Sequence, residues 1–278
     1  MLKQRVITAI VLLALLLPAL FAASPWPFAV LTLLLIGAAG WEWGRLNGMG
    51  ASGAIALGVA VAAACAAAIV AGWASLAPAW LWWPVALLWL VGGAQALRAG
   101  PSGWPQLWRP ARLALGVLLL VAAWIAMANA RTLGLNFLLS AFCLVWMADI
   151  AAYFGGRAFG RRKLAPTISP GKSWEGAWCG AAGVVLLGLA WRHVDRVQAI
   201  DVPSLFTRID LRWGVAGLIV ALVVLAAMSV VGDLFESLVK RAAGAKDSSG
   251  LLPGHGGVLD RVDALLPVLP VAMALATS

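Results

Sequence analysis

Residues 213–235 read WGVAGLIVALVVLAAMSVVGDLF, with Asp233 as the single charged side chain. About 20 apolar residues in a helix cross the hydrocarbon core of a bilayer, so this stretch predicts a transmembrane span. The rest of the chain has the same character, being 63% hydrophobic and 11% charged with a mean hydropathy of +0.95. Soluble domains carry roughly a quarter charged residues. Because the apolar runs are continuous rather than alternating, we predict an all-α, polytopic integral membrane protein rather than a β-barrel.

We predict about nine transmembrane helices, over residues 6–22, 27–43, 52–72, 78–97, 113–130, 134–155, 173–191, 213–235 and 258–276. Residues 1–278 form a single membrane domain in this interpretation, with 1–130 as a helical scaffold and 131–278 as the catalytic half. A cleaved signal peptide is an alternative for the first span, because Lys3 and Arg5 precede an apolar stretch that ends in small residues. We favour an uncleaved helix because so many spans follow. Pro267 and Pro270 are expected to kink the last span.

The distribution of basic residues predicts the topology. Cytoplasmic loops of membrane proteins carry an excess of Lys and Arg. With the N-terminus inside and the C-terminus outside, only 5 of the 20 lie outside, at Arg131, Arg192, Arg196, Arg208 and Arg212. Both polar regions described below then face the cytoplasm. The net charge of +9 is better explained by this membrane bias than by nucleic acid, so we expect no nucleic-acid partner.

The end of the 213–235 span carries the first set of candidate site residues. Asp233, Glu236, Ser237 and Lys240 are spaced i, i+3, i+4 and i+7, so they share one helix face. Glu236 and Lys240 have two interpretations, a simple i, i+4 pair or part of a site. Asp233 has no basic residue at i+4, and a carboxylate near hydrocarbon needs a partner. We therefore predict that Asp233 is a metal ligand.

A polar loop follows, and its glycines flank a histidine. Gly254, Gly256 and Gly257 surround His255, in a loop that also carries Lys246, and glycines let the backbone approach an anion closely. A helix predicted from Val258 places Asp260 and Asp263 on one face. Asp260 is then expected to meet Asp233 across the gap between the helices, where hard oxygen ligands would select Mg²⁺. Asp263 has an alternative role as a carboxylate favoured at a helix N-terminus.

A second polar region spans residues 149–175. Asp149 lies inside an apolar span, one turn before Tyr153, and is either a functional carboxylate or a structural hydrogen-bond partner of that tyrosine. Ser169 or Ser173 is predicted to cap the helix that follows, and Lys172 is placed to reach a phosphate beside its N-terminus.

Both polar regions resemble motifs of the phosphatidate cytidylyltransferases (CDP-diacylglycerol synthases). Residues 237–263 read S-x-x-K-R-x4-K-D-x-S-x2-L-P-x-H-G-G-x-x-D-R-x-D, and residues 164–176 read L-x-P-x-I-S-P-x-K-S-x-E-G. The resemblance covers residues 143–263; the first 130 residues match only as apolar scaffold. It implies transfer of CMP from CTP to phosphatidate, with release of pyrophosphate, in the bacterial inner membrane. The implied partners are CTP, phosphatidate and membrane lipids, and a homodimer is left open.

On this basis we assign roles to the candidate residues. A Mg²⁺ ion is expected on Asp233 and Asp260, and Asp263 and Asp149 are the candidates for a second cation. The catalytic set is Asp233, Asp260, Lys246, His255 and Arg261, with His255 either binding phosphate or donating a proton. Substrate binding is assigned to Lys172, Ser173, Ser237, Lys240, Arg241, Gly256 and Gly257.

Two other classes of function stay open. A membrane kinase could use CTP to phosphorylate a polyprenol, giving CDP rather than pyrophosphate. A transporter could line an ion path with carboxylates, but it should carry polar residues through both leaflets. Most of the 11 acidic residues here gather toward the predicted cytoplasmic side, which favours a one-sided enzyme site.

Overall fold

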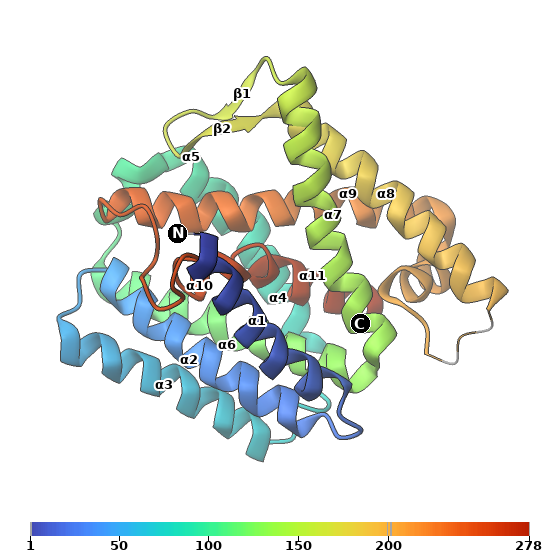
Figure 1. The fold of residues 1–278 in the computed structure, drawn as a ribbon, viewed down its shortest axis with the longest axis horizontal. Coiled ribbons are helices and arrows are strands. Elements are labelled where there is room, and N and C mark those ends of the chain that lie inside the picture. Colours follow the sequence, from blue (N-terminus) through green and yellow to red (C-terminus); the bar gives the residue numbers. More distant parts are fainter. Residues whose placement is uncertain (1, 199, 201, 278) are drawn as a thin grey trace.

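The computed structural model describes residues 2–198, 200 and 202–277, and most of this part of the chain is helical (Figure 1). The side chains of Lys3 and Arg5, on which the predicted topology partly rests, lie outside the described residues. The α-helices are α1 (Leu2–Phe21), α2 (Trp26–Leu46), α3 (Ala51–Val70), α4 (Trp82–Leu87), α5 (Ala94–Gly103), α6 (Arg109–Leu133), α7 (Leu135–Phe159), α8 (Trp174–Val197), α9 (Leu205–Ala242), α10 (Leu259–Val262) and α11 (Leu265–Thr277). Short 3₁₀ and π segments complete the helical set: η1 (Ala79–Leu81), η2 (Leu88–Gly93) and η3 (Trp104–Gln106).

Seven helical stretches among the described residues are long and apolar enough to cross a membrane. They are Trp26–Leu46, Ala51–Val70, Ala79–Gln106, Arg109–Leu133, Leu135–Phe159, Trp174–Val197 and Leu205–Ala242, and they match the second to eighth predicted spans. The first predicted span is the shorter apolar helix Val6–Phe21, within α1. The all-α, polytopic class is therefore confirmed, whereas the number nine and the orientation stay predictions.

The ninth predicted span, residues 258–276, differs most from the structure. It is divided into the four-residue α10 and the 13-residue α11, joined through Asp263 and Ala264. A helix of 13 residues is about 20 Å long at 1.5 Å per residue, short of the roughly 30 Å hydrocarbon core. The sequence analysis treated a site-bearing turn and an apolar helix as one element, because apolar residues continue through both.

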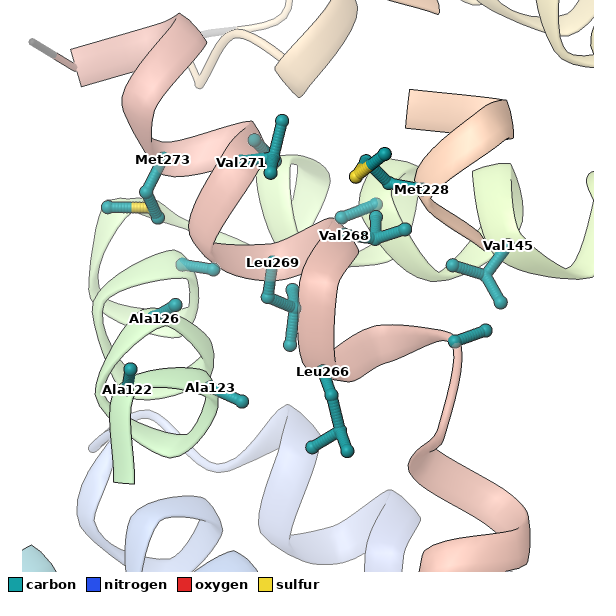
Figure 2. Packing of buried hydrophobic residues seen from close by; sticks show 14 of the residues in the cluster. Ala122, Ala123, Ala126, Val145, Met228, Leu266, Val268, Leu269, Val271 and Met273 are labelled. Atoms are coloured by element: carbon teal, nitrogen blue, oxygen red, sulfur yellow. The ribbon is translucent and has the colours of Figure 1, made fainter. Parts of the chain in front are cut away.

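Helix α11 lies inside the bundle, where other helices cover it. Val268, Leu269 and Ala274 are at most 1% exposed. Figure 2 shows α11 beside Ala122, Ala123 and Ala126 of α6, with Met228 of α9 and Val145 of α7 also facing this core. Small side chains on α6 let the two backbones approach closely, which is the usual means of helix packing in membranes. This core holds α6 and α9 together.

Large apolar side chains cover much of the outer surface. Ile55 and Val59 on α3, Leu186 on α8 and Val220 on α9 are all more than half exposed. A soluble protein rarely exposes so much contiguous apolar surface. These side chains are therefore suited to contact with lipid.

Helix α9 carries the polar residues of the site at its C-terminal end. Ser204 caps its N-terminus by accepting a hydrogen bond from the Thr207 backbone N–H at 3.2 Å. Gly214 interrupts the helix with φ of 67°, in the left-handed region that glycine adopts without a Cβ penalty. From there α9 continues to Ala242, so its polar last turns extend directly from the apolar span.

The only strands among the described residues form a small hairpin, which the sequence analysis did not predict. Strands β1 (Lys163–Ala165) and β2 (Ser169–Ser173) pair antiparallel, with Lys163 opposite Ser173. The hairpin joins α7 to α8 and lies at the top of Figure 1. Ser173 then caps α8, accepting a hydrogen bond from the Gly176 backbone N–H at 3.2 Å, which confirms the predicted cap.

Candidate active site

The polar face of α9 forms as predicted and meets the hairpin at Asp233. The Lys172 ammonium lies 2.5 Å from Asp233 Oδ2, and the Ser237 hydroxyl donates to Asp233 Oδ1 at 3.3 Å. Asp233 therefore has a basic partner after all, supplied from 61 residues away in the sequence. Both side chains keep more than a quarter of their surface exposed. Lys172, which we assigned to a phosphate, is held at the site by this carboxylate and has N–H donors left over.

Lys240 joins α9 to the turn that follows the loop. Its ammonium lies 2.5 Å from both Glu236 Oε2 and Asp260 Oδ1. The predicted i, i+4 pair is thus confirmed, but it is part of a three-residue cluster. This cluster is buried, with side-chain exposure of 12% for Lys240, 3% for Glu236 and 6% for Asp260.

Asp260 is the most fully hydrogen-bonded carboxylate of the predicted site. Besides Lys240, it accepts at Oδ2 from the Ser248 backbone N–H at 2.9 Å, the Ser248 hydroxyl at 2.8 Å and the Gly257 backbone N–H at 2.8 Å. Burial alone would raise the pKa of Asp260, but the Lys240 ammonium and the two backbone N–H donors lower that pKa to about 2. Asp260 is therefore an anion at neutral pH.

Asp263 and Asp149 add negative charge near Asp233. Burial, and then the charge of Asp233, raise the pKa of Asp263 to about 7, although the Ala264 backbone N–H donates to Asp263 Oδ1 at 2.8 Å. Asp263 follows the last residue of α10 and lies in the turn before α11, not in the first turn of the predicted helix. Asp149 is close enough for its charge to act on Lys172 and Asp233. Among the described residues, no hydrogen bond joins Asp149 to Tyr153, whose ring packs on Phe154 instead.

These carboxylates bear on the predicted Mg²⁺ site. Asp233 and Asp260 do not share a partner: Lys172 binds the first and Lys240 binds the second. Within the described part of the chain, no three His, Cys, Asp or Glu side chains are grouped so as to hold a metal by themselves. Mg²⁺ usually binds through one or two carboxylates plus substrate phosphates and retains waters. Asp233, Asp260 and the nearby Asp263 supply oxygen donors of the kind that this ion takes.

The glycines of the loop approach carboxylates of the protein itself. Gly256 has φ of 82°, and a Cβ there would meet Asp260 Oδ2. At Gly257 a Cβ would collide with the Ser248 hydroxyl and with a carboxylate from α2, Glu42. The predicted close approach to an anion is therefore present, but in the structure the anions are Asp260 and Glu42.

Four more predicted site residues lie on or next to the loop: Arg241 near the end of α9, Lys246 and His255 in the loop, and Arg261 in α10. Arg241, Lys246 and Arg261 are exposed, and within the described residues none has an ion-pair partner. His255 is half-buried, and its Nδ1 has no hydrogen-bond partner among the described residues. These side chains add three cationic groups and an imidazole to the polar region. The hairpin adds Arg162, which binds Glu175 of α8 at 3.0 Å.

Glu42 is the residue that the sequence analysis missed. It was counted among the acidic residues of the cytoplasmic side, but no role was assigned to it. The structure places it at 0% exposure, in contact with the loop that carries the motif. An acidic residue within an apolar span is a functional candidate by default, so the signal that could have identified Glu42 was present.

An apolar cavity of about 350 Å³ lies on another side of α9. It is lined mainly by apolar side chains, including Trp89, Trp104 and Phe235, together with the polar Gln95, and no charged side chain of the described residues lines it. The charged cluster at Asp233 and Asp260 suits a nucleotide phosphate better and is the candidate active site.

The fold and this cluster define a polytopic membrane protein whose charged groups gather at the end of apolar helices, around oxygen ligands and free cations. The chain belongs to the cytidylyltransferase family, whose model matches residues 3–278. A phosphatidate cytidylyltransferase of Pseudomonas aeruginosa is 39% identical over 282 residues, covering 99% of this chain and 97% of that protein. Two more proteins of that name are similar over shorter stretches. The one from Haemophilus influenzae is 47% identical over 137 residues (49% of this chain, 44% of that protein), and the one from Brucella suis is 50% identical over 125 residues (45% and 41%). The protein is thus a nucleotidyltransferase.

Proposed function

We propose that this protein transfers CMP from CTP to phosphatidate, giving CDP-diacylglycerol and pyrophosphate. The observation that carries the proposal is the likeness to the Pseudomonas aeruginosa phosphatidate cytidylyltransferase over 99% of the chain. The site supports it independently, because Lys172, Asp233, Lys240 and Asp260 meet where an apolar bundle ends. A lipid phosphate and a nucleotide phosphate can both reach such a place.

Both substrates are anions, so the protein has to bring like charges together. Arg241, Lys246 and Arg261 are exposed and form no ion pair among the described residues, so they can bind phosphate oxygens; Arg241 also donates from Nη1 to the Ala245 carbonyl at 3.1 Å. Lys172 and Lys240 keep N–H donors after binding their carboxylates, since an ammonium group has three. Their positions are fixed by Asp233, Glu236 and Asp260. Phosphoryl-type transfer depends mainly on positioning and on charge stabilisation, so these groups suffice without a protein nucleophile.

The covalent step is an in-line displacement. An oxygen of the phosphatidate phosphate forms a bond to the α-phosphorus of CTP, and the bond from that phosphorus to the oxygen bridging to the β-phosphate breaks. Pyrophosphate leaves with that electron pair, and the surrounding ammonium and guanidinium groups stabilise its charge. His255, with an unpartnered Nδ1, would bind a phosphate oxygen or donate a proton to the leaving group.

We also propose a Mg²⁺ requirement. Asp233 and Asp260 are the proposed ligands, and Asp263 and Asp149 are the proposed ligands of a second cation. When bound, Mg²⁺ would neutralise phosphate charge and make the α-phosphorus a better electrophile. The support is the acidic character of the site: the carboxyl groups of Asp149, Asp233 and Asp263 are close enough to act on one another or on Lys172, and Lys240 also acts on Asp263.

The proposal extends to location and assembly. The relatives are bacterial proteins and the apolar helices indicate a multi-pass membrane protein. We propose the inner membrane, an N-in and C-out topology and an active site facing the cytoplasm; a homodimer stays open. A cysteine introduced at the exposed Lys246 should react with a membrane-impermeant thiol reagent only after the cytoplasmic side is opened. Labelling in intact cells would contradict this orientation.

One assay separates the proposed activity from the alternatives. Purified protein is incubated with α-labelled CTP, phosphatidate and Mg²⁺, and the lipid extract and the aqueous phase are both analysed. We expect the label in a lipid-soluble nucleotide, together with one pyrophosphate per lipid. Release of labelled CDP on addition of a polyprenol would instead identify a kinase. Absence of both products would refute the proposed function.

A further inference from the structure

Glu42 is a carboxylate inside the protein that no cation accompanies. It lies on α2, at 0% exposure, and it takes part in no ion pair among the described residues. A charge at such a position is costly unless hydrogen bonds replace its hydration. The structure supplies these bonds, and all four donors belong to residues 248–259.

The four donors divide evenly between the two carboxylate oxygens. Oε1 accepts from the Ser249 hydroxyl at 2.5 Å and from the Val258 backbone N–H at 2.9 Å. Oε2 accepts from the Leu259 backbone N–H at 2.7 Å and lies 3.1 Å from the Ser248 hydroxyl, whose single proton it shares with Asp260 Oδ2 at 2.8 Å. Each oxygen of Glu42 thus faces one hydroxyl and one backbone donor. Glu42 therefore holds the two ends of the segment together, residues 248–249 and residues 258–259.

Ser248 connects Glu42 to the site. Its hydroxyl lies within hydrogen-bond distance of both Glu42 Oε2 and Asp260 Oδ2. Its backbone N–H, like that of Gly257, donates to Asp260. The groups that hold Asp260 are therefore on the same short segments that Glu42 holds. Displacement of either segment would remove N–H donors from Asp260 and leave that carboxylate free to turn away from Lys240.

We propose that Glu42 is a positioning residue for CMP transfer, acting from the N-terminal half by fixing residues 248–259 so that Asp260 keeps its direction toward Lys240 and the nucleotide. This inference rests on the proposed function, because it assigns Glu42 a part in that reaction. It gives α2, taken from the sequence as scaffold, a direct connection to the active site.

Glu42→Gln is the sharpest test. Glutamine keeps the length of the side chain and one acceptor oxygen. Its NH₂ group replaces the other oxygen and therefore faces one of the two pairs of loop donors, from which it cannot accept a hydrogen bond. Loss of a group that orients the residues in direct contact with a ligand typically lowers affinity or activity 10- to 100-fold. We expect kcat/KM for CTP to fall by roughly that factor, with a raised KM for CTP. Hydrogen–deuterium exchange of residues 248–260 should accelerate while the other segments stay unchanged.

Thr32→Val is the matched control. Thr32 is also buried on α2 and also hydrogen-bonded, to the Phe28 carbonyl at 2.8 Å and from Trp124 Nε1 at 3.2 Å, but it has no bond to the loop. We expect it to lower thermal stability and to leave the KM for CTP and the exchange of residues 248–260 at wild-type values. If Glu42 only stabilised the fold, Glu42→Gln would behave like Thr32→Val: it would lower the active fraction of the protein without changing the KM for CTP.

Two milder variants cover the case in which Glu42→Gln does not fold. Ser249→Ala removes one donor to Glu42, and Ser248→Ala removes the hydroxyl that bridges Glu42 and Asp260; both should raise the KM for CTP and loop exchange. Wild-type kinetics and wild-type loop exchange in folded Glu42→Gln, or in both serine variants, would overturn the inference. If the wild-type protein made no CDP-diacylglycerol, the proposed function would fail by itself, and loop exchange would still report whether Glu42 orders the segment.

Discussion

Replacing Lys240 with methionine tests whether the buried charge cluster stabilises the fold. Among the described residues, Lys240 is the one cation paired with Glu236 and Asp260, at 2.5 Å from each, and all three side chains are at most 12% exposed. The substitution would leave two carboxylates together without a cation. Breaking a buried pair by removing one partner costs about 3–5 kcal/mol, in line with about 4 kcal/mol for unit charges 4 Å apart at an effective dielectric constant of 20.

Lys172→Met provides the comparison, because it removes the other lysine of the site. Lys172 and Asp233 are 27% and 29% exposed, so water can solvate the carboxylate that remains. We expect this variant to lose only about 0–1 kcal/mol, the range of exposed pairs. The double variant Lys240→Met with Glu236→Gln should regain part of the loss, since one of the two buried carboxyl groups that lost their cation is replaced by a neutral amide.

The free energy of unfolding in mixed detergent micelles, measured by titration with a denaturing detergent, decides the matter. Helicity and monodispersity before the titration serve as controls for correct folding. A Lys240→Met protein within about 1 kcal/mol of the wild type, or equal to Lys172→Met, would show that solvent compensates the buried carboxylates and that the estimate from burial is wrong.

Three further outcomes can be measured on the same preparation. Asp233→Asn and Asp260→Asn should each abolish CMP transfer while the protein still inserts and purifies normally; near-normal turnover in either would remove the proposed metal site. Lys172→Ala should raise the apparent KM for CTP, and unchanged kinetics would contradict a role in phosphate binding. Gly257→Ala should lower both the melting temperature and the rate of CMP transfer, because a methyl group would collide with Ser248 and Glu42; wild-type values for both would show that the loop relaxes freely.

Local patterns in the sequence predicted the parts of the site that lie on one helix. The spacing of Asp233, Glu236, Ser237 and Lys240 fixes their common face through the helical period alone, and the structure confirms that face through the Ser237 and Lys240 contacts. The cap at Ser173 was predictable for the same reason, since it depends on residues three positions apart. The apolar runs of about 20 residues likewise predicted the second to eighth spans.

Contacts between distant segments were beyond the reach of such patterns. Lys172 and Asp233 are 61 residues apart, and Glu42 and Ser248 are 206 apart. Which carboxylate a given lysine binds depends on how the helices cross, and the sequence of one helix does not determine this. Asp233 and Asp260 illustrate the limit: the first pairs with Lys172 and the second with Lys240, which the sequence analysis did not predict, and their expected meeting stays a prediction. Asp263 lies beyond the end of α10 and not on one helix with Asp260.

The hairpin and the divided ninth span show where hydropathy misleads. Residues 163–173 are polar enough to be taken as a loop, yet a backbone ladder pairs Lys163 with Ser173. Residues 258–276 are apolar enough to be taken as a span, yet most of α11 is enclosed by protein. An apolar segment satisfies the same composition whether lipid or other helices surround it, so hydropathy cannot separate these cases.

The enclosure of α11 has a consequence for biosynthesis. This helix leaves the ribosome after α4, α6 and α9, the helices that surround it. Until α11 is synthesised, the faces of these helices that contact it must be covered by lipid tails or by one another. Packing of α11 then displaces those contacts. A newly made chain that ends before Leu265 would be inserted in the membrane but would lack the central helix of its core. We expect such a chain to be a preferred substrate for membrane proteases.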